Sequence, residues 1–237
     1  MSVAQIGCAS ALRVQFGPRF LNRQLPCDRY RWDALEERDA ASVDALRSLK
    51  KMGDGNGGTV YESLDGLAVK IVDGISTNAD EEDDFHNKDE AYKTCTAAKN
   101  DLAPRFKTAF KSGNTLVIEM EKFKLGNVDE YYKTIIRRFD GDTKVRLFKE
   151  LDTALLSFLE SLESSRYYHS DFTLENTVVE RKRNKLFVRG IDWSHMKEHV
   201  TRKGDFGWLS VEIECMKDAL PKAYSFAKSR DGYPEFL

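Results

Sequence analysis

The sequence predicts an α+β protein with a small, β-rich N-terminal half and a helical C-terminal half. Between residues 48 and 120, short stretches with strand character surround one helix, in the order β-β-β-α-β-β. Residues 143–164 then carry apolar side chains at helical spacing over a long stretch. The 237 residues are enough to bury a core, and this length favours one domain or one two-lobed unit with a short extension.

Turn chemistry marks the strands of the first half. Asp65-Gly66 is a tight-turn pair, so the stretches on either side of it are expected to form a hairpin. A second polar turn, Ser112-Gly113-Asn114, joins two further apolar stretches. The best-marked strands are therefore predicted at residues 59–63, 67–72, 105–110 and 115–120.

Helical spacing recurs on both sides of these strands. Residues 33–51 predict a helix that packs against the strands after it but lies outside the main fold. Residues 80–100 have an acidic start and no proline, which favours a helix that Pro104 ends. In the second half, the expected elements are the helix at 143–164, a hairpin formed by 176–180 and 186–191, and helical structure from about residue 206.

These elements divide the chain into three parts. Residues 1–45 form an N-terminal extension, which we expect to comprise a disordered leader and the start of a helix. Residues 46–120 form an N-terminal lobe, and residues 121–237 form a C-terminal lobe. The first 27 residues contain three arginines and no acid, which fits a frayed terminus, a transit peptide, or a leader for delivery into a host cell.

Composition excludes several classes of function. A net charge of −2 gives no support to nucleic-acid binding or to binding of anionic membranes. No apolar run approaches the ~18 to 20 residues that a membrane span requires. The four cysteines are far apart and form no C-x-x-C pair, so we expect neither a zinc site nor a disulfide framework. A reducing, intracellular (cytoplasmic) location follows from that expectation.

Glycines are concentrated between the first two strands. Gly53, Gly55, Gly57 and Gly58 fall within six positions and precede Val60. The last glycine opens no helix, and no Gly-Lys-Ser/Thr ending follows, so neither the dinucleotide-binding fingerprint nor the Walker P-loop fits. Glycines in a strand-turn-strand let backbone N–H groups approach phosphate oxygens, although a plain turn would also use them.

A lysine follows this loop by one hairpin. Lys70 lies in an apolar stretch that begins at Ala68, where a lysine is usually an edge or snorkelling residue. Here its ammonium could point beneath the glycine loop, toward nucleotide phosphates, if a carboxylate held it there. Glu90, in the middle of the next predicted helix, is the natural partner, with Asp89 and Glu82 as alternatives.

Two more motifs carry acid and amide groups. His169-x-Asp171 is followed by Asn176, five residues after the aspartate. A carboxylate at Asp171 could accept a hydrogen bond from an attacking hydroxyl, and the amide could ligate a metal. Asp192 ends the second strand of the 176–191 hairpin, where it could hold the Mg²⁺ that neutralises nucleotide phosphates.

The four features, taken in this order, resemble the protein-kinase-like superfamily over roughly residues 46–220. The resemblance implies a two-lobed protein-kinase-like fold with a small β-rich N-lobe and a truncated helical C-lobe. It implies ATP and Mg²⁺ as ligands, with Mn²⁺ as a substitute for Mg²⁺. Within the superfamily the chain is similar to minimal, atypical protein kinases of the effector type, which lack an activation segment.

The resemblance also implies individual roles. Catalysis would fall to Asp171, Lys70 and Glu90, and metal ligation to Asn176 and Asp192. Ile118 would be the gatekeeper side chain, and the backbone of Glu119 and Glu121 would bind adenine. The remaining nucleotide contacts would come from Gly53, Gly55, Gly57, Gly58, Val60, Ala68 and Lys70.

The chain also departs from the family pattern. Ser170 replaces the arginine that binds a phosphorylated activation loop, and Thr173 replaces the catalytic-loop lysine of serine/threonine kinases. Only residues 193–204 separate Asp192 from Asp205, which leaves almost no activation segment. The string Asp205-Phe206-Gly207 lacks a preceding hairpin, so we expect Asp205 to hold the catalytic-loop backbone rather than a metal.

The leading functional expectation is an ATP- and Mg²⁺-dependent protein kinase that transfers the γ-phosphoryl group to a protein hydroxyl, on serine or threonine. The main alternative is a catalytically weak or inactive kinase-like scaffold that binds nucleotide and a partner protein. A small-molecule kinase or an AMPylating enzyme is a third hypothesis. It fits less well, because small-molecule kinases usually elaborate the large lobe that this chain truncates.

Overall fold

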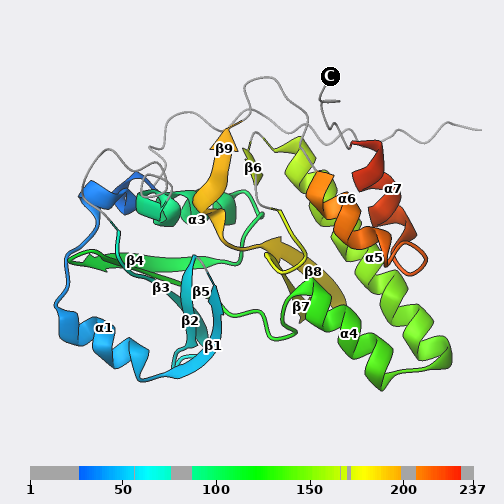
Figure 1. Ribbon diagram of the computed structural model, residues 1–237, viewed down its shortest axis with the longest axis horizontal. Coiled ribbons are helices and arrows are strands. Elements are labelled where there is room, and N and C mark those ends of the chain that lie inside the picture. Colours follow the sequence, from blue (N-terminus) through cyan, green and yellow to red (C-terminus); the bar gives the residue numbers. More distant parts are fainter. Residues whose placement is uncertain are drawn as a thin grey trace, which may run out of the picture.

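The computed structural model describes residues 27–55, 57–75, 87–165, 167–169, 172–198 and 207–230. Within them, a five-stranded antiparallel sheet fills the N-terminal half, and the helices of the C-terminal half surround a long central helix (Figure 1). The predicted α+β class, with strands first and helices second, is confirmed.

The sheet follows the predicted strands closely. Its spatial order is β1-β2-β3-β5-β4, so β3 and β5 are central neighbours although a helix and β4 separate them in sequence. The predicted turn at Asp65-Gly66 is present, because the Ser63 N–H donates to the Leu67 carbonyl across it at 2.9 Å. The strands are β1 (Lys50–Gly55), β2 (Gly58–Glu62), β3 (Leu67–Val72), β4 (Phe106–Ser112) and β5 (Thr115–Glu121).

A helix covers each face of this sheet. Helix α3 (Glu90–Lys99) lies on one face and α1 (Ala40–Arg47) on the other (Figure 1). The alternation of side chains along β3 explains the division. Ala68 and Val72 pack into the cluster that contains Ala91 and Cys95 of α3, whereas Val69 and Ile71 pack with Val43 of α1. Lys70 shares the α3 face with Ala68 and Val72.

The predicted helix at 33–51 was wrong in extent. Two 3₁₀ helices, η1 (Asp28–Tyr30) and η2 (Trp32–Ala34), precede a helix that begins only at Ala40. Asp39 caps that helix by accepting the Ser42 N–H at 2.9 Å, and such a cap fixes the first turn at this position. The helix is also not outside the fold, since Val43 is 3% exposed against the sheet.

The prediction that the chain has no disulfide framework was also wrong. Cys27, beside η1, and Cys95, in α3, form a disulfide with an S–S distance of 2.18 Å. Sixty-eight positions separate them, and they meet only because the N-terminal segment packs on α3. The basis for expecting a reducing compartment is therefore removed. Among the described residues, the remaining cysteine, Cys215, is free and exposed.

Helix α5 (Gly141–Ser164) is the axis of the C-terminal half, close to the predicted 143–164. Leu151, Leu155 and Phe158 on its inner face are almost fully buried. Its buried Asp152 accepts backbone N–H groups of Lys222 and Ala223, which satisfies the start of a later helix. Despite its 24 residues, α5 is too polar to cross a membrane, and no other described helix qualifies either.

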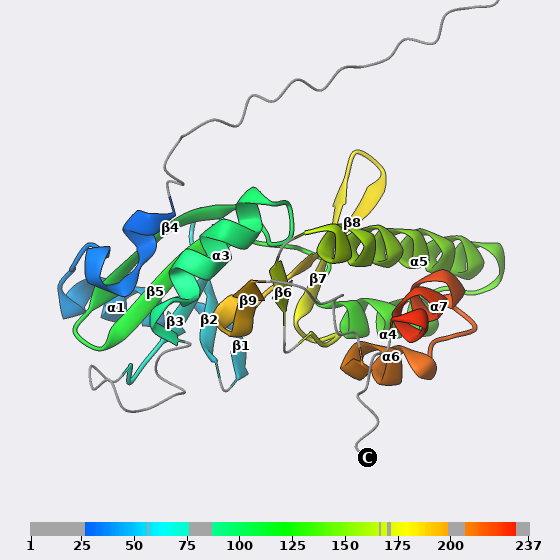
Figure 2. The same ribbon diagram turned by 90° about the horizontal axis from the view of Figure 1, so that it is seen from above.

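Further elements surround α5. The predicted hairpin is present as β7 (Thr177–Lys182) and β8 (Lys185–Gly190). The sequence prediction missed the helix α4 (Val128–Arg138) and the short antiparallel strand pair of β6 (Tyr167–His169) and β9 (Met196–Glu198). This strand pair lies between the two halves when the molecule is seen from above (Figure 2). The remaining elements are η3 (Trp193–His195), α6 (Gly207–Glu214) and α7 (Pro221–Ser229).

Candidate functional site

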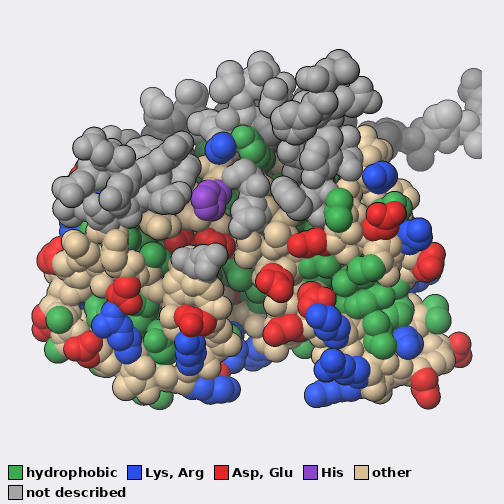
Figure 3. All heavy atoms as spheres, in the orientation of Figure 1, with side chains coloured by type: hydrophobic (Ala, Val, Ile, Leu, Met, Phe, Trp, Pro, Cys, Tyr) green, Lys and Arg blue, Asp and Glu red, His purple; other side chains and the backbone are tan. Residues whose placement is uncertain are grey.

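A buried lysine joins the two halves of the molecule. Lys70 Nζ lies 2.6 Å from Glu90 Oε1 and 3.0 Å from Asp192 Oδ1. The three side chains come from β3, from the start of α3, and from the end of β8, so residues 122 positions apart in sequence meet at one ammonium group. The structure thus brings together three of the predicted site residues. Figure 3 shows one face of the molecule, on which acidic (red) and basic (blue) side chains are spread over both halves.

Asp192 is held in place by its chain neighbours. Its backbone is in the left-handed region, at φ 58° and ψ 61°, which turns the chain sharply from β8 into η3. Ser194 Oγ donates to Asp192 Oδ1 at 3.0 Å. The following Trp193 is completely buried, and its indole N–H donates to the Gly190 carbonyl at 2.9 Å. The strained turn is therefore anchored on both sides, as expected for a carboxylate with a fixed direction.

The strand pair β6–β9 includes His169, the first residue of the other predicted motif, which lies beside the segment before Asp192. His169 is 2% exposed, and its Nε2 lies 2.7 Å from the Ile191 carbonyl, directly before Asp192. The Asn176 carbonyl accepts the Ile191 N–H at 2.8 Å, so the backbone of Asn176 is also tied to this segment. Asp171, the predicted catalytic carboxylate, lies outside the described residues, as does Ser170.

The glycine loop lies directly over this centre. A Cβ added to Gly57 would lie 2.5 Å from Asp192 Oδ2 and 3.0 Å from Lys70 Nζ. Gly58 has a φ of +116°, and a Cβ there would clash with the Ile71 carbonyl oxygen. Gly53 and Gly55 face open space, so sterics do not require glycine at either position. Only the second half of the loop therefore needs glycine in this arrangement.

Burial and charge act against each other in this centre. Burial raises the pKa of Glu90 to about 7, even though the Lys70 ammonium favours its charged form. Burial alone would also raise the pKa of Asp192, but Lys70 outweighs it and the pKa lies below its usual value. For Lys70, burial lowers the pKa and the two carboxylates raise it, with a net increase. The cation is thus the most firmly charged member of the group.

One carboxylate oxygen of Glu90 makes no hydrogen bond to the described residues. Glu90 is 1% exposed, and its Oε2 has no hydrogen-bond partner among the described residues. Such an atom costs free energy unless it is protonated or finds a donor. The raised pKa of Glu90 is consistent with this shortage of donors.

The residues predicted to contact adenine lie in and beside the central strand β5. Ile118 is fully buried opposite Lys70 in the β3–β5 pairing, and Met120 lies opposite Ala68 on the same face. Glu119 lies inside the central strand, and the Glu121 N–H donates to the Arg105 carbonyl at 2.8 Å. The Glu121 N–H therefore already has a backbone partner, and Glu119 lies in a strand that is paired on both sides.

Sequence reasoning missed two residues that support the site. Lys93, buried one turn after Glu90 on α3, donates to the Ser194 carbonyl, and burial lowers the pKa of its ammonium group. Glu212 of α6 accepts the Leu174 N–H at 2.6 Å. Glu212 thus holds the loop backbone at Leu174, whereas Asp205, the residue predicted to hold this loop, lies outside the described residues. The spacing of Lys93 from Glu90 was a usable signal, whereas nothing local marked Glu212.

The donor set around Asp192 suits a hard cation. Carboxylate and amide oxygens, as on Asp192 and Asn176, are the ligands that Mg²⁺ prefers. The described residues contain no group of three or more His, Cys, Asp and Glu side chains placed to hold a metal ion. An ion here would therefore need oxygens from a phosphate or from water as well.

Comparison of the chain with protein-family models found no match, and comparison with curated proteins found none.

Proposed function

We propose that this protein is an ATP- and Mg²⁺-dependent phosphotransferase of protein-kinase-like type, which transfers a γ-phosphoryl group to a serine or threonine of a protein. The observation that carries the proposal is the Lys70 ammonium group, held between Glu90 and Asp192 beneath a glycine loop. A purely structural ion pair would not need a glycine backbone against its carboxylate. This juxtaposition matches what phosphoryl transfer requires, a fixed cation beside a metal-binding acid under an unobstructed backbone.

Each residue has a defined task in this mechanism. Glu90 fixes the Lys70 ammonium, which contacts phosphate oxygens and stabilises the charge that develops on them. The backbone N–H groups around Gly57 and Gly58 cover the same oxygens. Asp192 and Asn176 would hold Mg²⁺, which when bound neutralises phosphate charge. Asp171 would accept a hydrogen bond from the acceptor hydroxyl and orient it for attack.

The base would lie farther along the same face of the sheet. Val60 pairs with Lys70 across β2 and β3, and Met120 pairs with Ala68 across β3 and β5. Small and flexible apolar side chains at these positions suit contact with a flat aromatic ring. Ile118, opposite Lys70, would limit the depth of that slot.

One observation favours a second candidate, a nucleotide-binding or ligand-free scaffold with little transfer activity. A Cβ on Gly57 would lie 2.5 Å from Asp192 Oδ2, so the loop leaves little room for a phosphate beside that carboxylate. Thr173 also supplies no cation for the transferring group. The scaffold hypothesis therefore predicts slow transfer or none, with the same buried centre serving stability.

A labelling assay distinguishes the two candidates. The protein is incubated with γ-labelled ATP, Mg²⁺ and a cell lysate, beside Asp171→Ala, Lys70→Met and Asp192→Asn variants. If the protein is a phosphotransferase, the wild type labels protein. The amount of label should fall at least about a hundredfold in every variant, because each variant lacks charge stabilisation or acceptor orientation. The matched control is Lys185→Met, which removes an exposed lysine at the start of β8, outside the centre.

The outcomes separate cleanly. ATP binding without labelled protein would favour the scaffold. Label from α-labelled ATP would indicate nucleotidyl transfer instead. Equal labelling by wild type and the Asp192→Asn variant, with both proteins folded, would overturn the assignment of this centre.

A further inference from the structure

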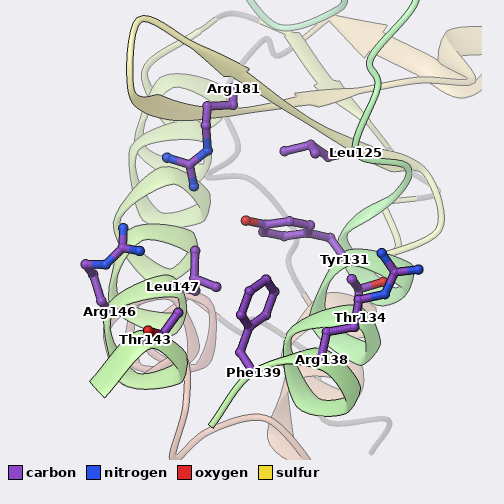
Figure 4. Close-up of a pocket in the computed structure, with 9 residues that line it drawn as sticks. All are labelled: Leu125, Tyr131, Thr134, Arg138, Phe139, Thr143, Arg146, Leu147 and Arg181. Atoms are coloured by element: carbon purple, nitrogen blue, oxygen red, sulfur yellow. The ribbon is translucent and has the colours of Figure 1, made fainter. Parts of the chain in front are cut away.

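A cavity lies in the C-terminal half, between α4 and α5. It has a volume of about 470 Å³, within the usual range for small-molecule sites. Figure 4 shows Tyr131 of α4, Phe139 after it and Leu147 of α5 directed into the space, with Leu125 closing one side. No residue of the Lys70 centre lines this cavity, so its use does not depend on the proposed function.

Arginines surround this apolar floor. Arg146 comes from α5 and Arg181 from β7, and the Arg181 guanidinium group reaches from the strand toward the cavity in Figure 4. Arg138, the last residue of α4, lies at the rim. None of the described residues that line the cavity is acidic, although the chain as a whole has a net charge of −2. The local charge is therefore opposite in sign to that of the molecule.

A single carboxylate serves two of these arginines. Glu150 Oε1 lies 2.8 Å from Arg146 Nη1, and Glu150 Oε2 lies 2.7 Å from Arg181 Nη2. Within the described chain, no carboxylate lies within 4.0 Å of Arg138. The guanidinium groups of Arg146 and Arg181 thus share one negative charge. Each guanidinium carries five N–H donors, so Arg146 and Arg181 keep donors available after binding Glu150.

We propose that this cavity binds a small amphipathic organic anion, with an aromatic or alkyl body and one carboxylate, sulfonate or phosphate group. The body would lie against Tyr131, Phe139 and Leu147, where it is removed from water. The anionic end would take the remaining donors of Arg146 and Arg181, which Glu150 holds in a fixed position. Charge complementarity therefore selects an anion over a neutral body of the same shape.

The experiment uses defined probes on the full chain. Anilinonaphthalene sulfonate, which combines an aromatic body with one anionic group, is titrated while its fluorescence is followed. 4-Phenylbutyrate and 4-phenylbutanol, which differ in the carboxylate, then compete for the site. We expect the acid to displace the probe and the alcohol to compete at least about tenfold more weakly, with weaker binding of the acid at high salt.

Variants locate the binding in the cavity. Arg146→Glu changes an exposed side chain, and Thr143→Trp fills the cavity from the start of α5 without removing a charge. Either should weaken competition by 4-phenylbutyrate at least about tenfold. Lys185→Glu is the control, because it makes the same charge change on an exposed turn that does not line the cavity.

Four results would overturn the proposal, and the first three concern the probes and variants above. They are absence of probe binding, equal competition by the acid and the alcohol, and unchanged competition in a folded Thr143→Trp variant. The result for Thr143→Trp stays decisive even if the Arg146→Glu variant fails to fold. Thermal unfolding of each variant shows whether it is folded. Probe displacement only by peptides, and not by 4-phenylbutyrate, would also contradict it and assign the cavity to protein docking.

Discussion

At the scale of single residues, burial and charge oppose each other in the centre of this protein. When Glu90 is ionised, two carboxylates face the Lys70 ammonium group, and the buried Lys93 ammonium group also acts on Glu90. Glu90 carries most of the consequence because it is the more deeply buried acid, and its pKa rises to about 7. Below about pH 7, the proton on Glu90 leaves the Lys70 ammonium group balanced by the Asp192 carboxylate.

The raised pKa of Glu90 predicts a specific dependence of stability on pH. Folded Glu90 keeps its proton up to about pH 7, whereas the unfolded side chain loses it near its ordinary value of 4.5. The folded state therefore binds more protons between these values, so the free energy of unfolding should fall as pH rises from about 5 to 7. At 1.36 kcal/mol per pKa unit, the fall is at most roughly 3 kcal/mol.

Urea unfolding at pH 5 and pH 8 measures this effect. The Glu90→Gln variant should lack the decline, while Glu160→Gln, an exposed change on α5, should keep it. Asp192 does not interfere, because its lowered pKa affects stability only as pH falls below about 4. An identical slope in wild type and Glu90→Gln would contradict the burial-driven shift.

At the scale of elements, α3 connects three parts of the molecule. Cys95 ties it to the N-terminal segment, Glu90 ties it to the sheet through Lys70, and Lys93 ties it to the segment after Asp192. The helix is only ten residues long, so these ties rather than intrinsic propensity must hold it. Changes at one tie are therefore expected to reach the others.

The contribution of the Cys27–Cys95 disulfide to stability can be tested directly. Cys27→Ser should lower the free energy of unfolding by about 2 to 4 kcal/mol, because the unfolded chain loses a long closed loop. For a protein of this size, that corresponds to a melting temperature lower by on the order of 5 to 15 °C. Reductant should destabilise wild type similarly but leave Cys27→Ser unchanged. Cys215→Ser, which alters the exposed free cysteine, should melt like wild type; if it matched Cys27→Ser instead, the disulfide would not be the cause.

Sequence reasoning succeeded where the signal is local. The Asp65-Gly66 turn and the apolar period of α5 are each written within a few neighbouring residues, and both are found as predicted. The contact of Lys70 with Glu90 was also accessible, because a strand, a helix and their order fix which faces meet. The capping box of Asn127 and Glu130 was an unused local signal for α4.

The failures involve contacts that only the tertiary fold creates. Cys27 and Cys95 are 68 positions apart, and no spacing rule pairs them. Glu212 reaches the Leu174 backbone because α6 packs beside that loop, which its own sequence does not reveal. The helix predicted at 33–51 failed for a different reason, since a cap at Asp39 outweighed the apolar period.

At the scale of the whole molecule, the two halves meet at the Lys70 centre. The sheet half supplies Lys70 and Glu90, and the helical half supplies Asp192 together with the segment paired through β6 and β9. A ligand that contacts all three would bridge the halves and should bind only when both are folded. This arrangement is the basis for assigning the centre to nucleotide phosphates and Mg²⁺.

The affinity for ATP with and without Mg²⁺, measured by calorimetry in wild type and Asp192→Asn, tests that assignment most directly. We expect Mg²⁺ to tighten ATP binding to wild type by about tenfold or more, and to leave Asp192→Asn almost unaffected, because the variant loses the metal-binding carboxylate. ATP that binds wild type equally well in the presence of a chelator, or does not bind at all, would contradict the account.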